Sequence, residues 1–128
     1  MYKLSFTLLA IATLSACNTA PPTQLTHIDS ATIPVVANVK SSVKPAEMAA
    51  LHQENKQIID NLTLSLKSEY LLDVKPAEIF DAHSQAHQVY MSLSKLDQFR
   101  MVNNFYFKEH NFAGLQQVNT SLKPLLRG

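Results

Sequence analysis

Two of the five histidines stand at a spacing that is suited to metal binding. His83 and His87 are four residues apart, and on a helix this spacing places both imidazoles on one face, where they can share a metal ion. The metalloprotease pattern H-E-x-x-H is absent because Ser84 follows His83, so the glutamate base of that mechanism is missing. The pair predicts a metal or small-ligand site at His83 and His87, with histidines on a solvated helix edge as the alternative.

A third histidine, His52, occupies the place equivalent to His83 in an internal repeat with an offset of 31 residues. In an antiparallel helical hairpin, His52 would lie roughly 30 Å from the turn and His83 roughly 12 Å from it, at about 1.5 Å per residue. The two side chains can therefore meet only across an antiparallel dimer. A homodimer is the form in which such a joint site is possible.

The other titratable and nucleophilic residues do not form a catalytic pattern. Glu47 and Glu78 are explained as first-turn residues, since a carboxylate there interacts favourably with the positive end of the helix dipole. The nucleophile pattern G-x-S-x-G is missing, and a chain with Gly114 and Gly128 as its only glycines cannot form a glycine-rich phosphate loop. We therefore expect a protein that is not an enzyme.

An aromatic group near the C-terminal end is a candidate partner-binding surface. It consists of Phe105, Tyr106, Phe107 and Phe112. Large aromatic side chains dominate binding energies at protein interfaces, and a groove between two helices can accept a partner helix. The alternative is that these rings form part of the core and pack the end of a helix.

Composition and charge exclude some classes of function. The chain has 128 residues with 11 basic and 10 acidic side chains, and the lysines between Lys40 and Lys123 are scattered singly. Binding to nucleic acid requires a concentrated basic surface, so a nucleic-acid partner is not expected. Two glycines are too few for the many tight turns of an all-β domain. The composition therefore favours long helices.

An internal repeat marks two helix starts. The segment VKPAEM at 43–48 recurs as VKPAEI at 74–79. Proline suits the first position of a helix, and the residue before proline is pushed out of the helical region. Apolar residues at spacings of three and four follow each start and predict two helices, which a short connection makes antiparallel. A third, shorter helix is expected after Asn111, whose side chain can cap it.

The expected fold is thus all-α: an antiparallel helical hairpin with a shorter C-terminal helix, occupying residues 43–128. Two alternatives stay open. Alternation of Leu62, Leu64 and Leu66 is compatible with a strand. A break near Asn61 and Ser92 would divide each repeat into a helix pair, resembling a two-unit solenoid of the tetratricopeptide class.

Residues 17–42 are predicted to form a flexible tether, because they are polar and proline-rich at the start and show no helical periodicity. A coil of this length would average roughly 25–30 Å from end to end. The alternative is that the patch Ile33-Pro34-Val35-Val36 docks on the helices as an extended strand.

The N-terminus has the features of a targeting segment. Lys3 precedes an apolar run from Leu4 to Leu14, which is shorter than the roughly 20 residues of a membrane-spanning helix. The following residues, Leu14-Ser15-Ala16-Cys17, resemble the lipobox of bacterial lipoproteins. The resemblance covers residues 1–17, and an ordinary secretory signal with a chance cysteine is the alternative.

The lipoprotein resemblance implies a defined processing and location. It implies removal of residues 1–16, a diacylglycerol on the Cys17 thiol and an N-acyl chain such as palmitate on its amino group. It also implies an outer-membrane location, since Asn18 rather than aspartate follows the cysteine. Several acyl chains together anchor a protein stably, whereas one chain binds only marginally. With Cys17 as the single cysteine, no intramolecular disulfide can form.

These observations lead to one expected function and one alternative. The expected function is that of a membrane-anchored, non-catalytic interaction or assembly module that binds another envelope protein, with no cofactor beyond the covalent lipid. Small helical lipoproteins that pilot secretion or pilus channel subunits are the nearest analogy, which rests on architecture alone. The alternative is a periplasmic metal or small-ligand binder that uses His83 and His87.

Overall fold

The structure is built from helices joined by short turns. The computed structural model describes residues 27–70 and 76–126. Its elements in chain order are η1 (Ile28–Ser30), α3 (Pro45–Tyr70), α4 (Pro76–Ile79), α5 (Gln85–Lys108), α6 (Phe112–Leu122) and η2 (Lys123–Leu126). Within the two described ranges no residue lies in a strand, so the all-α prediction is confirmed.

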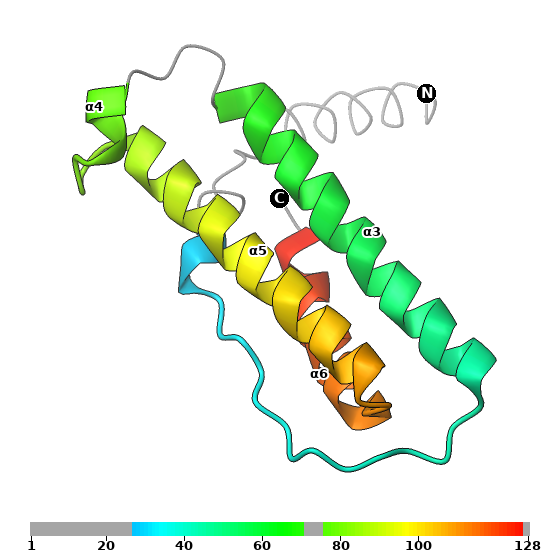
Figure 1. Cartoon of the computed structure of the whole chain (residues 1–128). Coiled ribbons are helices and arrows are strands. Elements are labelled where there is room, and N and C mark those ends of the chain that lie inside the picture. The colour runs from blue at the N-terminus through cyan, green and yellow to red at the C-terminus, as the bar shows by residue number, and fades with distance from the viewer. Residues whose placement is uncertain (1–26, 71–75, 127–128) are drawn as a thin grey trace, which may run out of the picture.

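The three long helices run up, down and up. Figure 1 shows α3 and α5 side by side in opposite directions, with α6 turning back along both of them. This is the expected hairpin with a shorter C-terminal helix. Helix α3 is continuous through Asn61, and α5 is continuous through Ser92. The strand at 62–66 and the division into tetratricopeptide-like helix pairs are therefore both wrong.

The core lies where the three helices face one another. Fully buried side chains come from every long helix and from η1: Ile28, Ile59, Leu66, Val89, Leu96, Phe99, Leu115, Val118 and Leu122. Most of them are positions that the three- and four-residue spacing assigned to a buried face. The same spacing after the second repeat start also assigns Ile79, Ala82 and Tyr90 to the buried face, but Ala82 and Tyr90 are exposed and Ile79 is half-buried.

The two copies of the repeat begin different structures. Pro45 begins the 26-residue helix α3, whereas Pro76 begins α4, which ends after one turn at Ile79. Side-chain hydrogen bonds turn the chain after α4: the Ser84 hydroxyl donates to the carbonyl oxygens of Glu78 and Asp81 at 2.5 and 2.8 Å. Local bonds of this kind compete with helix continuation. Ser84 then caps α5, so the second long helix begins at Gln85 and not at Pro76.

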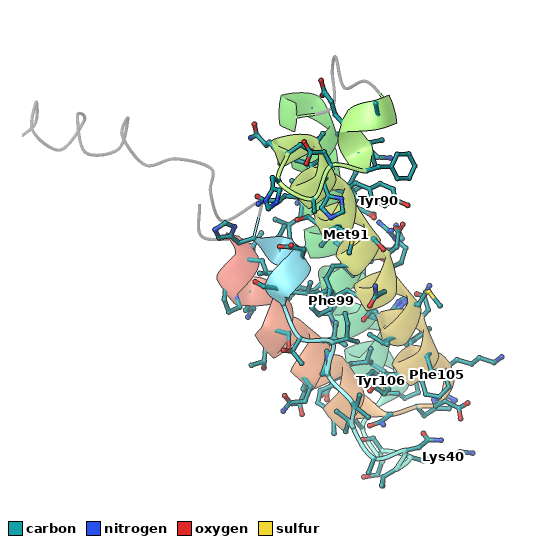
Figure 2. All side chains as sticks on the ribbon, turned by 90° about the vertical axis from the view of Figure 1, so that its left-hand side faces the viewer. Lys40, Tyr90, Met91, Phe99, Phe105 and Tyr106 are labelled. Carbon is teal, nitrogen blue, oxygen red and sulfur yellow. The ribbon has the colours of Figure 1, made fainter. Side chains whose placement is uncertain are left out.

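Residues 31–42, which we call the strap, are packed on the helices instead of forming a free tether. Ile33 and Val36 pack against the core cluster, and the Tyr106 hydroxyl donates to the Pro34 carbonyl at 2.9 Å and accepts from the Val36 amide at 3.0 Å. Figure 2 shows the strap running between α5 and α6. The prediction of a flexible tether is therefore wrong for residues 31–42. The alternative is what the structure shows: the Ile33–Val36 patch docks on the helices, although it does not pair as a strand.

The turn between α5 and α6 is compact because of three residues. His110 has a φ of 55°, in the left-handed region, and the Asn111 side chain accepts a hydrogen bond from the Gly114 amide at 3.0 Å, which confirms the predicted cap. A Cβ atom at Gly114 would overlap the Tyr106 ring. Glycine at this position therefore lets α6 approach α5 closely enough to bury that ring.

Candidate functional site

The three long helices contact one another along three seams. Each seam is occupied by a different set of residues. The strap and η1 lie along the seam between α5 and α6. Side-chain pairs cross the seam between α3 and α5, among them Asp60 with Arg100 at 2.9 Å and His52 with Asn104 at 2.8 Å. The seam between α3 and α6 contains an open hollow of about 510 Å³, which we call the groove.

The groove is lined by one stripe from each of two helices. Helix α3 supplies Glu47, Ala50, Leu51 and Glu54, and α6 supplies Phe112, Gln116, Asn119 and Thr120. Both sets follow the three- and four-residue spacing that places side chains on one helix face. The half-buried Leu51 and Phe112 pack against the core cluster and form an apolar floor, while exposed Glu47, Glu54 and Gln116 form a polar rim. The volume falls within the roughly 300–1,000 Å³ that is typical of small-molecule pockets.

Buried asparagines below the groove hold its two walls in register. Asn55 on α3 donates from its amide nitrogen to Asn103 Oδ1 on α5 at 2.9 Å and to the Leu115 carbonyl oxygen on α6 at 3.1 Å. Its amide oxygen accepts from Asn119 of α6 at 2.9 Å. Asn55 and Asn103 are almost fully buried. Because these bonds are directional and partly or fully removed from water, they favour one arrangement of α3 and α6.

The rim carries negative charge at two points. Glu47 and Glu54 stand seven residues apart on α3, which corresponds to about 10.5 Å along a helix. Glu54 accepts a hydrogen bond from Asn119 at 2.5 Å and lies 3.9 Å from the Lys123 ammonium group at one end of the groove. Among the eight described residues that line the groove, none is basic.

The four aromatic residues predicted to bind a partner do not share one surface. Phe112 lines the groove, and Phe105 is half-exposed on the outer side of α5. Tyr106 is 5% exposed and holds the strap. Phe107 stacks on the His52 ring with centroids 4.3 Å apart. The prediction of an exposed aromatic anchor is therefore wrong for Tyr106, because its ring is needed in the interior.

The two histidines predicted to share a metal ion lie on different elements. His83 is exposed in the turn before α5, and His87 is in the first turn of that helix. The Nδ1 atom of His87 donates to the Ile79 carbonyl oxygen at 2.7 Å, which uses one of its two ring nitrogens in the turn. Across the described residues, no three side chains of the types His, Cys, Asp and Glu come together as a metal site. The shared helix face was wrong, and metal binding stays a prediction.

A cluster of charges crosses the seam between α3 and α5. The Arg100 guanidinium contacts Asp60 at 2.9 Å and Asp97 at 2.7 Å, and Lys56 contacts Asp60 at 3.0 Å. The hydrogen bonds from Arg100, and next those from Lys56, lower the pKa of the Asp60 carboxyl below its usual value. The Asp60 side chain remains 44% exposed, so this cluster is a surface clamp between two helices.

A second surface carries apolar side chains toward solvent. Phe80 is 84% exposed in the turn after α4, and Tyr90, Met101 and Phe105 on α5 are 51%, 70% and 50% exposed. Spacings of 11 and 4 residues place the three α5 side chains on one helix face. Figure 2 shows Tyr90 and Phe105 along the edge of α5 that is turned away from the strap. We call Tyr90, Met101 and Phe105 the outer row of α5.

Sequence reasoning missed the groove as a site. Glu47 was explained by the helix dipole, and Leu51 fits the three- and four-residue spacing of apolar residues after the first repeat start. Each explanation is sufficient locally, because the groove exists only where α6 passes α3. The aromatic signal at Phe112 was the one clue that pointed to this part of the surface.

Comparison with protein-family models, with curated proteins and with solved structures found no match for this chain. No helix in the described ranges has the length and apolar character needed to cross a bilayer.

Proposed function

We propose that this chain is a lipid-anchored, non-catalytic interaction module of the bacterial envelope, and that it binds a partner protein in the groove between α3 and α6. The observation that carries the proposal is the groove itself: an open seam of about 510 Å³ with Leu51 and Phe112 at its floor. Apolar grooves between two helices are a recurrent way of binding an amphipathic helix.

The groove is prepared for a partner before binding. The Asn55 network joins α3, α5 and α6 through hydrogen bonds. Because the two walls are already ordered, association with a partner should cost little further conformational entropy in these helices. Its floor is apolar and its rim is polar, which is the usual arrangement of a protein interface. No catalytic group is required for this function.

The anchor is the second part of the proposal. The lipobox resemblance assigns the lipid to Cys17, and Asn18 supports an outer-membrane location. Ile28 is buried against the helices, and nine residues, 18–26, separate His27 from the lipidated cysteine. The ten Cα–Cα steps from Cys17 to His27 span at most about 35 Å. The groove would therefore be presented to partners close to the membrane surface.

Site-specific photocrosslinking in intact cells tests the binding function. A photoreactive amino acid at Gln116 lies in the groove, whereas one at the neighbouring exposed Gln117 does not line it. We expect a discrete protein adduct from position 116 and none from position 117. Equal labelling at both positions, or none at either, would contradict the proposal.

Metabolic labelling tests the anchor independently. We expect incorporation of a clickable palmitate analogue into the native chain, and none into the Cys17→Ser variant, because the thiol that receives the diacylglycerol is absent. Label in the variant, or no label in the native chain, would remove the lipoprotein assignment while leaving the groove proposal to its own test.

A further inference from the structure

We infer that the partner segment recognised by the groove is a basic amphipathic helix, with two lysine or arginine residues seven positions apart on either side of an apolar residue. This inference rests on the proposed function and adds the chemistry of the partner.

The negative charge of the rim favours a partner segment that carries positive charge. Glu47 and Glu54 are both exposed, and the groove lining contains no basic residue among its eight described members. Lys123 and Asn119 contact Glu54 from one end, whereas no hydrogen bond or ion pair is assigned to the Glu47 side chain in the described part of the chain. A cationic group can pair with Glu47 without displacing an existing contact, while an acidic partner would be repelled.

The order of acidic and apolar side chains along α3 favours a particular spacing of basic residues in the partner helix. Glu47, Leu51 and Glu54 occupy positions i, i+4 and i+7 of α3, so acidic and apolar groups alternate along about 10.5 Å. A partner helix with basic residues at i and i+7 and leucine between them presents the complementary pattern. Lysine and arginine stems are themselves apolar and can cover part of the floor while their charged ends reach the rim.

The size of the groove selects a short helical stripe. Its lining spans two turns of α3 and slightly more than two turns of α6. A single face of a partner helix supplies three or four side chains over that length, which suits a hollow of about 510 Å³.

Titration with a model peptide tests this inference. The probe is a 15-residue leucine–lysine peptide with the i, i+4, i+7 pattern, and its control replaces each lysine with glutamate. The full chain as isolated from cells is held in phosphatidylcholine nanodiscs, and empty nanodiscs serve as the blank. We expect the lysine peptide to bind, the glutamate peptide not to bind, and added salt to weaken the binding.

Two pairs of variants locate the binding. Glu47→Gln should weaken the lysine peptide by about two- to fivefold, the range of an exposed ion pair. Glu78→Gln should not, although Glu78 follows the same Pro-Ala sequence in the first turn of α4. Gln116→Trp fills the groove and should weaken binding at least about tenfold, whereas Gln117→Trp should leave it unchanged.

The outcomes separate this inference from the proposed function. Equal binding of the two peptides, or equal effects within both variant pairs, would overturn the basic-helix assignment. If crosslinking at position 116 in cells still yields a discrete adduct, the interaction function stands and only the partner chemistry falls. If that crosslinking fails as well, both are wrong.

Discussion

The Asn55 side chain connects α3 to both of the other long helices. It contacts Asn103 on α5, and on α6 it contacts Asn119 and the Leu115 carbonyl oxygen. Each of these groups is partly or fully removed from water, so each requires a partner. An apolar residue at position 55 would supply none of these bonds. The hydrophobic pattern of α3 would have accepted a leucine there, which makes the asparagine a determinant of how the helices are arranged.

Replacement of Asn55 by alanine should therefore be costly. We expect the free energy of unfolding to fall by about 2–4 kcal/mol, because the buried Asn103 oxygen and the Leu115 carbonyl lose their partner. Asn61→Ala is the matched control on the exposed side of α3, and its effect should stay within about 0.5 kcal/mol. Urea unfolding followed by circular dichroism measures both. A similar small loss for both variants would show that the network does not stabilise the fold.

Asp60 should contribute stability that depends on pH. Its pKa is lowered in the folded state by hydrogen bonds from Arg100 and then Lys56, so the contribution is present above the unfolded-state pKa of about 4 and is lost as the pH falls through the lowered folded pKa. The side chain is 44% exposed, so we expect Asp60→Asn to cost less than about 1 kcal/mol at pH 7. Unfolding curves of both proteins should converge at acidic pH. A difference that persists unchanged at pH 2 would contradict this assignment.

At the scale of elements, the strap is what distinguishes the fold from a plain three-helix arrangement. It has no secondary structure of its own, and several of its backbone groups form hydrogen bonds with the Tyr106 side chain and with the turn between α5 and α6. Tyr106 binds Pro34 and Val36, Asn111 donates to the Ala37 carbonyl at 2.9 Å, and the Ser41 amide donates to the His110 carbonyl at 2.8 Å. The strap thereby covers the seam between α5 and α6.

Removal of one hydroxyl should loosen the strap without unfolding the helices. Tyr106→Phe keeps the ring that packs on Gly114 but deletes the bonds to Pro34 and Val36. We expect the Val36 amide to exchange with solvent about tenfold faster, since each lost hydrogen bond is worth roughly 0.5–1.5 kcal/mol. Tyr90→Phe, on an exposed ring, should leave that exchange rate unchanged. Unaltered protection of Val36 in the Tyr106 variant would mean that the hydroxyl does not hold the strap.

At the scale of the whole molecule, one core stabilises the domain and two surfaces are left for other roles. Phe99 is fully buried and lies among side chains of the three long helices and η1. The groove and the outer row of α5 lie outside this core. The exposed residues of these surfaces that contact neither the core nor the Asn55 network are therefore expected to tolerate substitution without loss of the fold.

Substitution of two phenylalanines, one in the core and one on the surface, compares how much each region contributes to stability. We expect Phe99→Ala to lower the free energy of unfolding by about 3–5 kcal/mol, because it leaves a large cavity. Phe80→Ser should change it by no more than about 0.5 kcal/mol, since that ring is 84% exposed. Thermal unfolding of the full chain compares the two. A large loss with Phe80→Ser would indicate that the turn after α4 packs more tightly than its exposure implies.

The helical class, the hairpin and most of the core could be predicted from the sequence because these properties follow from local patterns. Spacings of three and four residues fixed the buried faces of α3, α5 and α6, and Asn111 marked the start of α6 through an ordinary cap. Proline and glutamate marked both repeat starts. The second start gives a helix of only one turn, because hydrogen bonds of Ser84 and Asp81 turn the chain after α4. The lipobox is also a local pattern that can be recognised in the sequence, and the lipid anchor that it implies stays a proposal.

Only the tertiary structure decided the strap and the groove. The strap depends on Tyr106 and Asn111, which lie about 70 residues away from the backbone groups that they bind. The groove depends on the path of α6 past α3, which is set by Gly114 against Tyr106 and by the Asn55 network. Neither relation appears as a spacing along the chain. Local patterns determine which face of each helix is apolar, whereas contacts between distant side chains determine which seams are covered and which one stays open.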